Sequence, residues 1–119
     1  MSKSGRDIDF LHDIEDAITR ALEYTNGLTW DGYLQDHKTQ DAVVRNMEVL
    51  GEATKNLSDE FREQYPDIPW RDMSGTRDRL IHHYFGINQE IVWQIVQQDL
   101  PGLKKKIEQL ISEFPMGDS

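Results

Sequence analysis

The spacing of apolar residues along the chain predicts helices from one end to the other. From Ile8 to Thr25 apolar side chains recur at steps of three and four, as in a helix with one buried face, and Asn26 and Gly27 end the stretch. A second stripe with this spacing contains Gly51, and a polar turn over residues 30–39 separates the two. The stripes consist of Leu11, Ile14, Ile18 and Leu22, and of Val43, Met47, Leu50, Thr54 and Leu57.

A short helix is expected directly after the second stripe. Ser58 is a good N-cap, because its side chain can accept a hydrogen bond from a free backbone N–H of the first turn. Asp59 and Glu60 supply the negative charge that a helix N-terminus favours, and Pro66 stops the helix. The sequence "DIPW", residues 67–70, is then a connector.

Two more helical regions follow. One starts between residues 69 and 74 and is expected to end at Gly86. Asn88 can cap the last region, which Pro101 must kink or split. The expected apolar positions are Met73, Leu80, Ile81 and Tyr84 in the first region, and Val92, Val96, Leu103, Ile107, Leu110 and Phe114 in the second.

The favoured architecture is an all-α bundle of four to six helices. No segment shows convincing strand alternation, a hairpin dipeptide or a glycine-rich phosphate loop. We expect residues 1–119 to form a single domain, with residues 115–119 as a loose tail. Trp70 and Trp93 are large enough that we expect them to fill the core or a dimer seam.

Composition narrows the class of protein. The 119 residues contain no cysteine and carry a formal charge of −9, which argues against a free-standing nucleic-acid binder because such binding depends on neutralising phosphates. The N-terminal residues lack the apolar core of a signal peptide, and no apolar run approaches the ~20 residues that cross a bilayer. A cytoplasmic location is therefore expected.

The sequence "RDRLIHHYF", residues 77–85, stands out against this acidic background. Residues 71–83 contain three arginines and two aspartates, a charge of +1 with neutral histidines, so the rest of the chain carries −10. One explanation is structural, because histidines stabilise a helix C-terminus and Arg79 could pair with Asp78 or Asp72 on the surface. The other explanation is a functional site.

These residue types are sufficient to cleave RNA without a metal. The imidazole of His82 can take the proton of a ribose 2′-OH, and the guanidinium of Arg77 can stabilise the charge that develops on the phosphate. On one ideal helix Arg77 and His82 would lie about 140° apart, whereas Arg79 would face His82 and His83. A two-fold dimer would bring Arg77 and His82 together from two chains.

The spacing of Arg77, His82 and Tyr84, with the polar Asp78 directly after the arginine, resembles the signature of the HepT-like branch of the HEPN ribonuclease superfamily. The segments "VVRNMEVLGEATKNLS", "YPDIPWRDM" and "HHYFGINQEIVWQIVQQDLPGL" resemble that branch in order and spacing, so the similarity covers nearly the whole chain. An aspartate at position 78 departs from the commoner asparagine of the family.

The resemblance implies an all-helical homodimer with the motif in a cleft near the two-fold axis, acting as a metal-independent endoribonuclease toxin of a toxin–antitoxin pair. Arg77 and His82 would be catalytic, and Asp78 would be the supporting polar residue. The antitoxin would be an MNT-type nucleotidyltransferase that attaches AMP to Tyr84, and tRNA would be a target. No cofactor is implied, and Arg79 and His83 are further candidates for RNA contact.

Other polar groups have simpler explanations. Arg45, Glu48 and Glu52 form a solvated face or a polar dimer seam, for which Gly51 hints at close helix approach. His12 and Asp16 are two ligands without a third, and no metal site is expected. Residues 104–106, "KKK", are a solvated surface or a guide for RNA. The alternative function is a non-catalytic helical module that binds a nucleotidyltransferase or a nucleotide.

Overall fold

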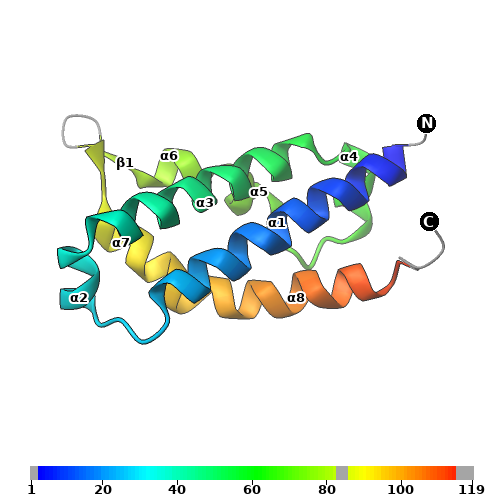
Figure 1. Ribbon diagram of the computed structural model, residues 1–119. Coiled ribbons are helices and arrows are strands. Elements are labelled where there is room, and N and C mark those ends of the chain that lie inside the picture. The colour runs from blue at the N-terminus through cyan, green and yellow to red at the C-terminus, as the bar shows by residue number, and fades with distance from the viewer. Residues whose placement is uncertain (1–2, 83–85, 115–119) are drawn as a thin grey trace.

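The computed structural model describes residues 3–82 and 86–114, and it is built almost entirely from helices, as predicted. Helices α1 (Lys3–Thr25) and α3 (His37–Asn56) run antiparallel along the long axis, with α8 (Leu100–Ser112) beside α1 (Figure 1). The particle measures 44 × 30 × 23 Å. The two predicted stripes form the facing sides of α1 and α3.

The polar turn expected over residues 30–39 was wrong, because residues 30–35 form helix α2 (Trp30–Gln35). Thr29 caps α2 by accepting a hydrogen bond from the backbone N–H of Gly32 at 3.1 Å. Tyr33 is fully buried and donates a hydrogen bond to Gln89 Oε1 at 2.5 Å. Asp36 is both the C-cap of α2 and the N-cap of α3. The predicted turn between the two long helices therefore contains a short helix that shares a capping residue with α3.

The predicted cap at Ser58 is confirmed. Ser58 begins helix α4 (Asp59–Gln64) and its Oγ accepts a hydrogen bond from the N–H of Phe61 at 3.1 Å. Asp7 of α1 is buried and accepts two further hydrogen bonds, from the N–H and the Oγ of Ser58, both at 2.8 Å. Helix α4 is therefore anchored to the first helix by one carboxylate.

The single helix predicted from about residue 70 to Gly86 was wrong. The chain instead forms two short helices, α5 (Trp70–Ser74) and α6 (Thr76–Leu80), separated at Gly75. After Leu80 it forms a small antiparallel hairpin of β1 (Ile81–His82) and β2 (Gly86–Ile87). Gly86 has φ +78, a conformation that favours glycine and places it at the turn rather than at a helix end.

The last helical region behaves largely as predicted. Asn88 caps α7 (Gln89–Gln94) by accepting a hydrogen bond from the N–H of Ile91 at 3.2 Å. A π-helical turn, η1 (Ile95–Asp99), joins α7 to α8, and Pro101 lies in the first turn of α8, where a missing N–H costs little. The kink or split expected at Pro101 is therefore replaced by the π-helical turn that precedes it.

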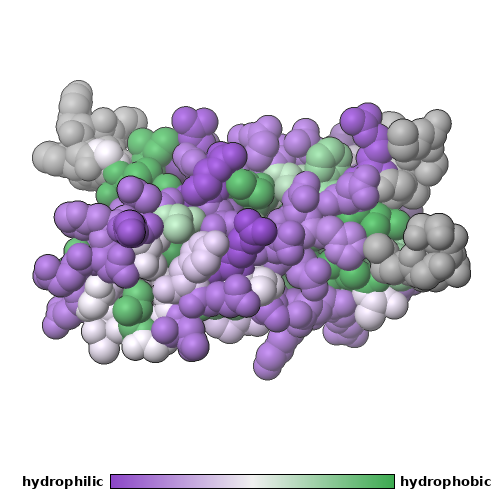
Figure 2. Space-filling view, in the orientation of Figure 1, coloured by the Kyte–Doolittle hydropathy of each residue, from purple (hydrophilic) through white to green (hydrophobic). Residues whose placement is uncertain are grey.

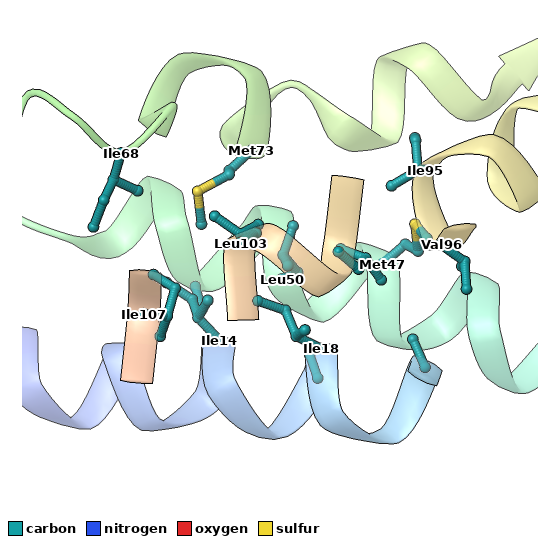
Figure 3. Packing of buried hydrophobic residues seen from close by; sticks show 14 of the residues in the cluster. Ile14, Ile18, Met47, Leu50, Ile68, Met73, Ile95, Val96, Leu103 and Ile107 are labelled. Carbon is teal, nitrogen blue, oxygen red and sulfur yellow. The ribbon is translucent and has the colours of Figure 1, made fainter. Parts of the chain in front are cut away.

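The core is the contact region of α1, α3, α5, η1 and α8. Figure 3 shows Ile14 and Ile18 of α1 meeting Met47 and Leu50 of α3, with Leu103 of α8 beside them. Trp70 is buried in the core, one of the two places expected for it, and Trp93 packs against the core while remaining partly exposed. Hydrophilic residues cover most of the face seen in Figure 2. None of the described helices is long and apolar enough to span a membrane.

Candidate functional site

Helix α6 and the hairpin after it carry the residues of the predicted motif. The backbone leaves the helix at Ile81 and becomes extended, and the N–H of Asn88 donates to the carbonyl of Leu80 at 2.7 Å, which closes the base of the hairpin. His82 pairs through its backbone with Gly86 in this hairpin. The helical geometry expected for Arg77 and His82, about 140° apart on one helix, was therefore wrong.

Parts of the predicted site fall outside the described residues. The backbone of His82 is described but its side chain is not, and His83 and Tyr84 belong to the segment that joins β1 to β2, outside the description. Of the stripe predicted to face the core, Met73 and Leu80 are buried, whereas Ile81 is 44% exposed because it has left the helix.

Two buried residues fix the direction in which α6 presents its charged side chains. Thr76 and Leu80 are four positions apart and both are buried, and Thr76 Oγ1 donates to the carbonyl of Met73 at 2.7 Å. Arg77, Asp78 and Arg79 are exposed as a result.

Gly51 of α3 lets the short helices sit close to the bundle. A Cβ at Gly51 would lie 3.4 Å from the carbonyl oxygen of Met73 and 3.9 Å from Cβ of Thr76. The close helix approach suggested by Gly51 is therefore confirmed, but the neighbour is α5 of the same chain. This contact places the start of α6, and hence Arg77, over the C-terminal half of α3.

Arg77 lies at a groove of about 430 Å³ between α1 and α3, which we call the Arg77 groove. Arg77 makes no hydrogen bond or ion pair with any residue of the described ranges. An exposed guanidinium without a partner is available to bind an anion such as phosphate. The remaining lining residues of the groove are Phe10, Asp13, Arg45, Glu48, Val49, Glu52, Ala53 and Asn56.

The charges of the Arg77 groove are mixed rather than simply basic. Two guanidiniums, of Arg45 and Arg77, face three carboxylates, of Asp13, Glu48 and Glu52, so the formal sum is −1. The contribution of α1 was missed by sequence reasoning, because nothing in the sequence pattern shows which part of α1 lies beside α6. A phosphate that enters this groove must contact the arginines in preference to the acids.

Arg79 lies at a different surface from Arg77. Its guanidinium is 4.0 Å from Asp99 of η1, and it lines a second groove of about 350 Å³. Arg79 was expected to pair with Asp78 or Asp72 on the surface. That prediction was wrong, because the ion pair is with Asp99. Both side chains of the Arg79–Asp99 pair are about half exposed, so the pair is weak.

The remaining polar candidates are ordinary surface pairs. His12 Nδ1 lies 3.7 Å from Glu15, and the described residues contain no cluster of three or more side chains that could hold a metal ion. Lys104 donates to Glu108 at 2.7 Å and Lys106 donates to the carbonyl of Asp67 at 3.3 Å. Two of the three consecutive lysines thus have contacts within the chain.

Comparisons with known proteins identify the family. The model of the family described as ribonuclease HepT-like matches residues 14–110. A Methanocaldococcus jannaschii protein named "Putative RNase" is 49% identical over 105 residues, which are 88% of this chain and 87% of the relative. A Thermococcus cleftensis protein named "Probable ribonuclease HepT" is 45% identical over 102 residues, which are 86% of this chain and 93% of the relative. No solved structure gives a significant match. Because the family model covers most of the chain, Arg77 and His82 included, the chain belongs to the ribonuclease HepT-like family.

Proposed function

We propose that this chain is a metal-independent endoribonuclease whose catalytic residues are Arg77 and His82. One observation carries the proposal: the Arg77 guanidinium is exposed at a groove of about 430 Å³ and has no partner among the described residues. The chain runs from Arg77 directly into the hairpin that contains His82, so both residues belong to one short surface segment. Membership in the ribonuclease HepT-like family supports the ribonuclease activity in this proposal.

The proposed reaction uses the ribose as the nucleophile. His82 takes the proton of the 2′-OH, the 2′-oxygen attacks the adjacent phosphorus, and the P–O5′ bond breaks. The leaving 5′-oxygen takes a proton from water, and the hydroxide that remains takes the proton held by His82, which restores the neutral imidazole. The other product ends in a 2′,3′-cyclic phosphate. Arg77 stabilises the negative charge that builds up on the phosphoryl oxygens. DNA lacks the 2′-OH and is not a substrate.

The neighbouring residues take secondary roles in this proposal. Asp78 follows Arg77 on α6 and is exposed, so its carboxylate can orient a donor near the phosphate without being desolvated. Arg79 and His83 are candidates for RNA contact. Because Arg79 lines the second groove, it would contact a different part of the bound RNA from the part at Arg77, and the RNA would pass over α6 between the two.

The chain is further proposed to be the toxin of a toxin–antitoxin pair and to work as a homodimer, with tRNA as a candidate target. A partner MNT-type nucleotidyltransferase would transfer AMP from ATP to the hydroxyl of Tyr84, with release of pyrophosphate. Tyr84 lies two residues after His82 in the sequence. A bulky anion there would block the site and repel the RNA backbone.

The test compares Arg77→Ala with Arg71→Ala, a matched control that removes an exposed arginine of α5 away from the Arg77 groove. Both proteins are sized and then incubated with labelled RNA, and the products are resolved on a gel. We expect Arg71→Ala to cleave like the wild type, and Arg77→Ala to lose at least about a hundredfold in rate, a typical cost of removing an electrostatic stabiliser. Full cleavage by Arg77→Ala would reject the assigned role.

The alternative is a non-catalytic module that binds a nucleotidyltransferase or a nucleotide. The observation in its favour is the acidity of the Arg77 groove, where carboxylates outnumber guanidiniums. Expression of the wild type beside His82→Ala separates the two functions. Growth arrest with RNA cleavage only in the wild type supports the enzyme, and identical behaviour of the two proteins supports the module.

Tyr84→Phe should leave a toxin that the partner cannot modify. A mass spectrum of the peptide that contains residue 84 would then show no added AMP.

A further inference from the structure

The second groove, at which Arg79 lies, has an apolar floor. Its volume of about 350 Å³ is near the lower end of the range for small-molecule sites, so the groove fits a single ring system. Buried side chains of α3, α5 and α8 form the floor, and Leu50, Met73 and Leu103 lie next to one another in Figure 3. A flat apolar group can therefore be desolvated on this floor.

Two features of the last helical region keep this groove open. The π-helical turn η1 contributes Ile95, Gln98 and Asp99 to one wall, and such turns occur frequently at functional sites. Gly102 of α8 also lines the groove, and a Cβ there would meet nothing within 4 Å. The groove is thus free space beside an irregular turn.

The polar groups of the second groove include a free carboxylate. Asp72 is exposed in the first turn of α5, and its carboxylate makes no ion pair with any described residue. Asp99 and Arg79 form only the weak pair at 4.0 Å, and Lys106 donates to a backbone carbonyl. Two acids and two cations sum to zero, so the groove favours an uncharged group with N–H donors over a phosphate.

We propose that the second groove binds one unpaired guanine base of the RNA substrate, whose N1–H and N2 amino group donate hydrogen bonds to the Asp72 carboxylate. The inference rests on the proposed function and adds a base-specific subsite to it. A carboxylate only accepts hydrogen bonds. Guanine is the RNA base whose pairing edge offers two adjacent donors, because adenine and cytosine offer a donor beside an acceptor and uracil has one donor between two acceptors.

The other groups of the groove have matching roles. The Met73 thioether can contact the face of the base, and Arg79, which is half exposed, can bind a phosphate beside it. Helix α6, about 10 Å across, separates this base from the phosphate at Arg77, so the guanine lies a few nucleotides from the cut. Such a subsite directs cleavage to single-stranded loops that contain guanine.

RNAs that differ in one base test the subsite. Oligouridine with a single central guanosine is compared with the same strand carrying inosine, which lacks the N2 amino group, or adenosine. Copies with 2′-O-methyl sugars are not cleaved, and fluorescence anisotropy measures their Kd. We expect inosine and adenosine each to weaken binding by at least about tenfold, as the loss of a hydrogen bond to a charged group predicts. In the cleavable RNA, the cut should move with the guanosine when the guanosine is moved.

Asp72→Asn tests the assigned residue. An amide offers one acceptor and one donor, which match adenine as well, so the preference for guanosine over adenosine should fall by at least about tenfold. The rate at saturating RNA should stay unchanged. Asp31→Asn is the matched control, because Asp31 is also an exposed aspartate in the first turn of a short helix but lies outside both grooves. Circular dichroism checks that both variants are folded.

The outcomes separate the subsite from the proposed function. Equal Kd values for the three strands, or an unchanged preference in Asp72→Asn, would overturn the subsite. Cleavage at positions unrelated to the guanosine would keep the proposed function and reject the subsite. Guanosine-dependent binding that requires Asp72, without any cleavage, would keep the subsite and reject the proposed function.

Discussion

The buried Asp7 carboxylate makes a quantitative prediction about stability. Asp7 is 3% exposed, and its two oxygens accept hydrogen bonds from the N–H and the Oγ of Ser58. The substitution Asp7→Ala removes this acceptor, so the N–H and the Oγ of Ser58, at the start of α4, lose their hydrogen bonds to the carboxylate. Hydrogen bonds to charged groups contribute about 1.5–3 kcal/mol each, and the losses overlap because both involve Ser58. We expect Asp7→Ala to lower the free energy of unfolding by about 2–4 kcal/mol.

Urea denaturation followed by circular dichroism measures this loss, with Asp9→Ala as the matched control. Asp9 is exposed on the same helix, and its removal should change the free energy of unfolding by less than about 0.5 kcal/mol. Ser58→Ala and the double variant complete a cycle that should show coupling between the two residues. A loss below about 1 kcal/mol for Asp7→Ala, or strictly additive losses, would refute the anchoring role of this carboxylate.

Three further predictions concern glycines and a buried tyrosine. Gly102→Ala should stabilise by about 0.5–1 kcal/mol in a thermal melt, because a Cβ there meets nothing within 4 Å and helical glycine is unfavourable. Gly51→Leu should cost about 1–3 kcal/mol and reduce RNA cleavage, because its side chain would push against α5 and displace Arg77; unchanged melting and cleavage would contradict this. Burial, and secondarily the charge of Asp41, raise the pKa of Tyr33 above its ordinary value. The unfolded chain therefore loses this proton first, and stability should fall as pH rises above about 10, whereas Tyr33→Phe should lose this part of the pH dependence in urea titrations at pH 9–11.

The sequence predicted the long helices well because their burial is periodic. Ile14 and Ile18 on α1 and Met47 on α3 are core residues at helical spacing, and the caps at Ser58 and Asn88 act through local hydrogen bonds. Such features depend only on neighbours along the chain, so a sequence pattern can show them.

The errors occurred where tertiary contacts decide the local structure. Helix α2 has only Tyr33 as a buried residue, too little for a periodic signal, and it is fixed by contacts with α3 and α7. The sequence between Trp70 and Gly86 predicts one helix. In the structure this helix is interrupted at Gly75 and ends at Leu80. A register such as the pairing of His82 with Gly86 has no local signature in two-residue strands.

The candidate site shows the same division. The motif residues Arg77 and His82 were identified from sequence, and Arg77 does line a groove. The divergence of Arg77 and Arg79 into two grooves depends on which face of α6 is buried, which Thr76 and Leu80 determine. The acidic character of the Arg77 groove comes from α1 and α3 and could not be read from the motif.

Cleavage of an RNA oligonucleotide in EDTA, beside the same oligonucleotide with 2′-deoxy sugars, tests the proposed chemistry most directly. If His82 activates a ribose hydroxyl and Arg77 stabilises the phosphate, the wild type should cut the RNA in EDTA, leave a 2′,3′-cyclic phosphate and spare the 2′-deoxy strand. Cleavage of the 2′-deoxy strand at a similar rate, or complete loss of RNA cleavage in EDTA that added Mg²⁺ restores, would contradict the account.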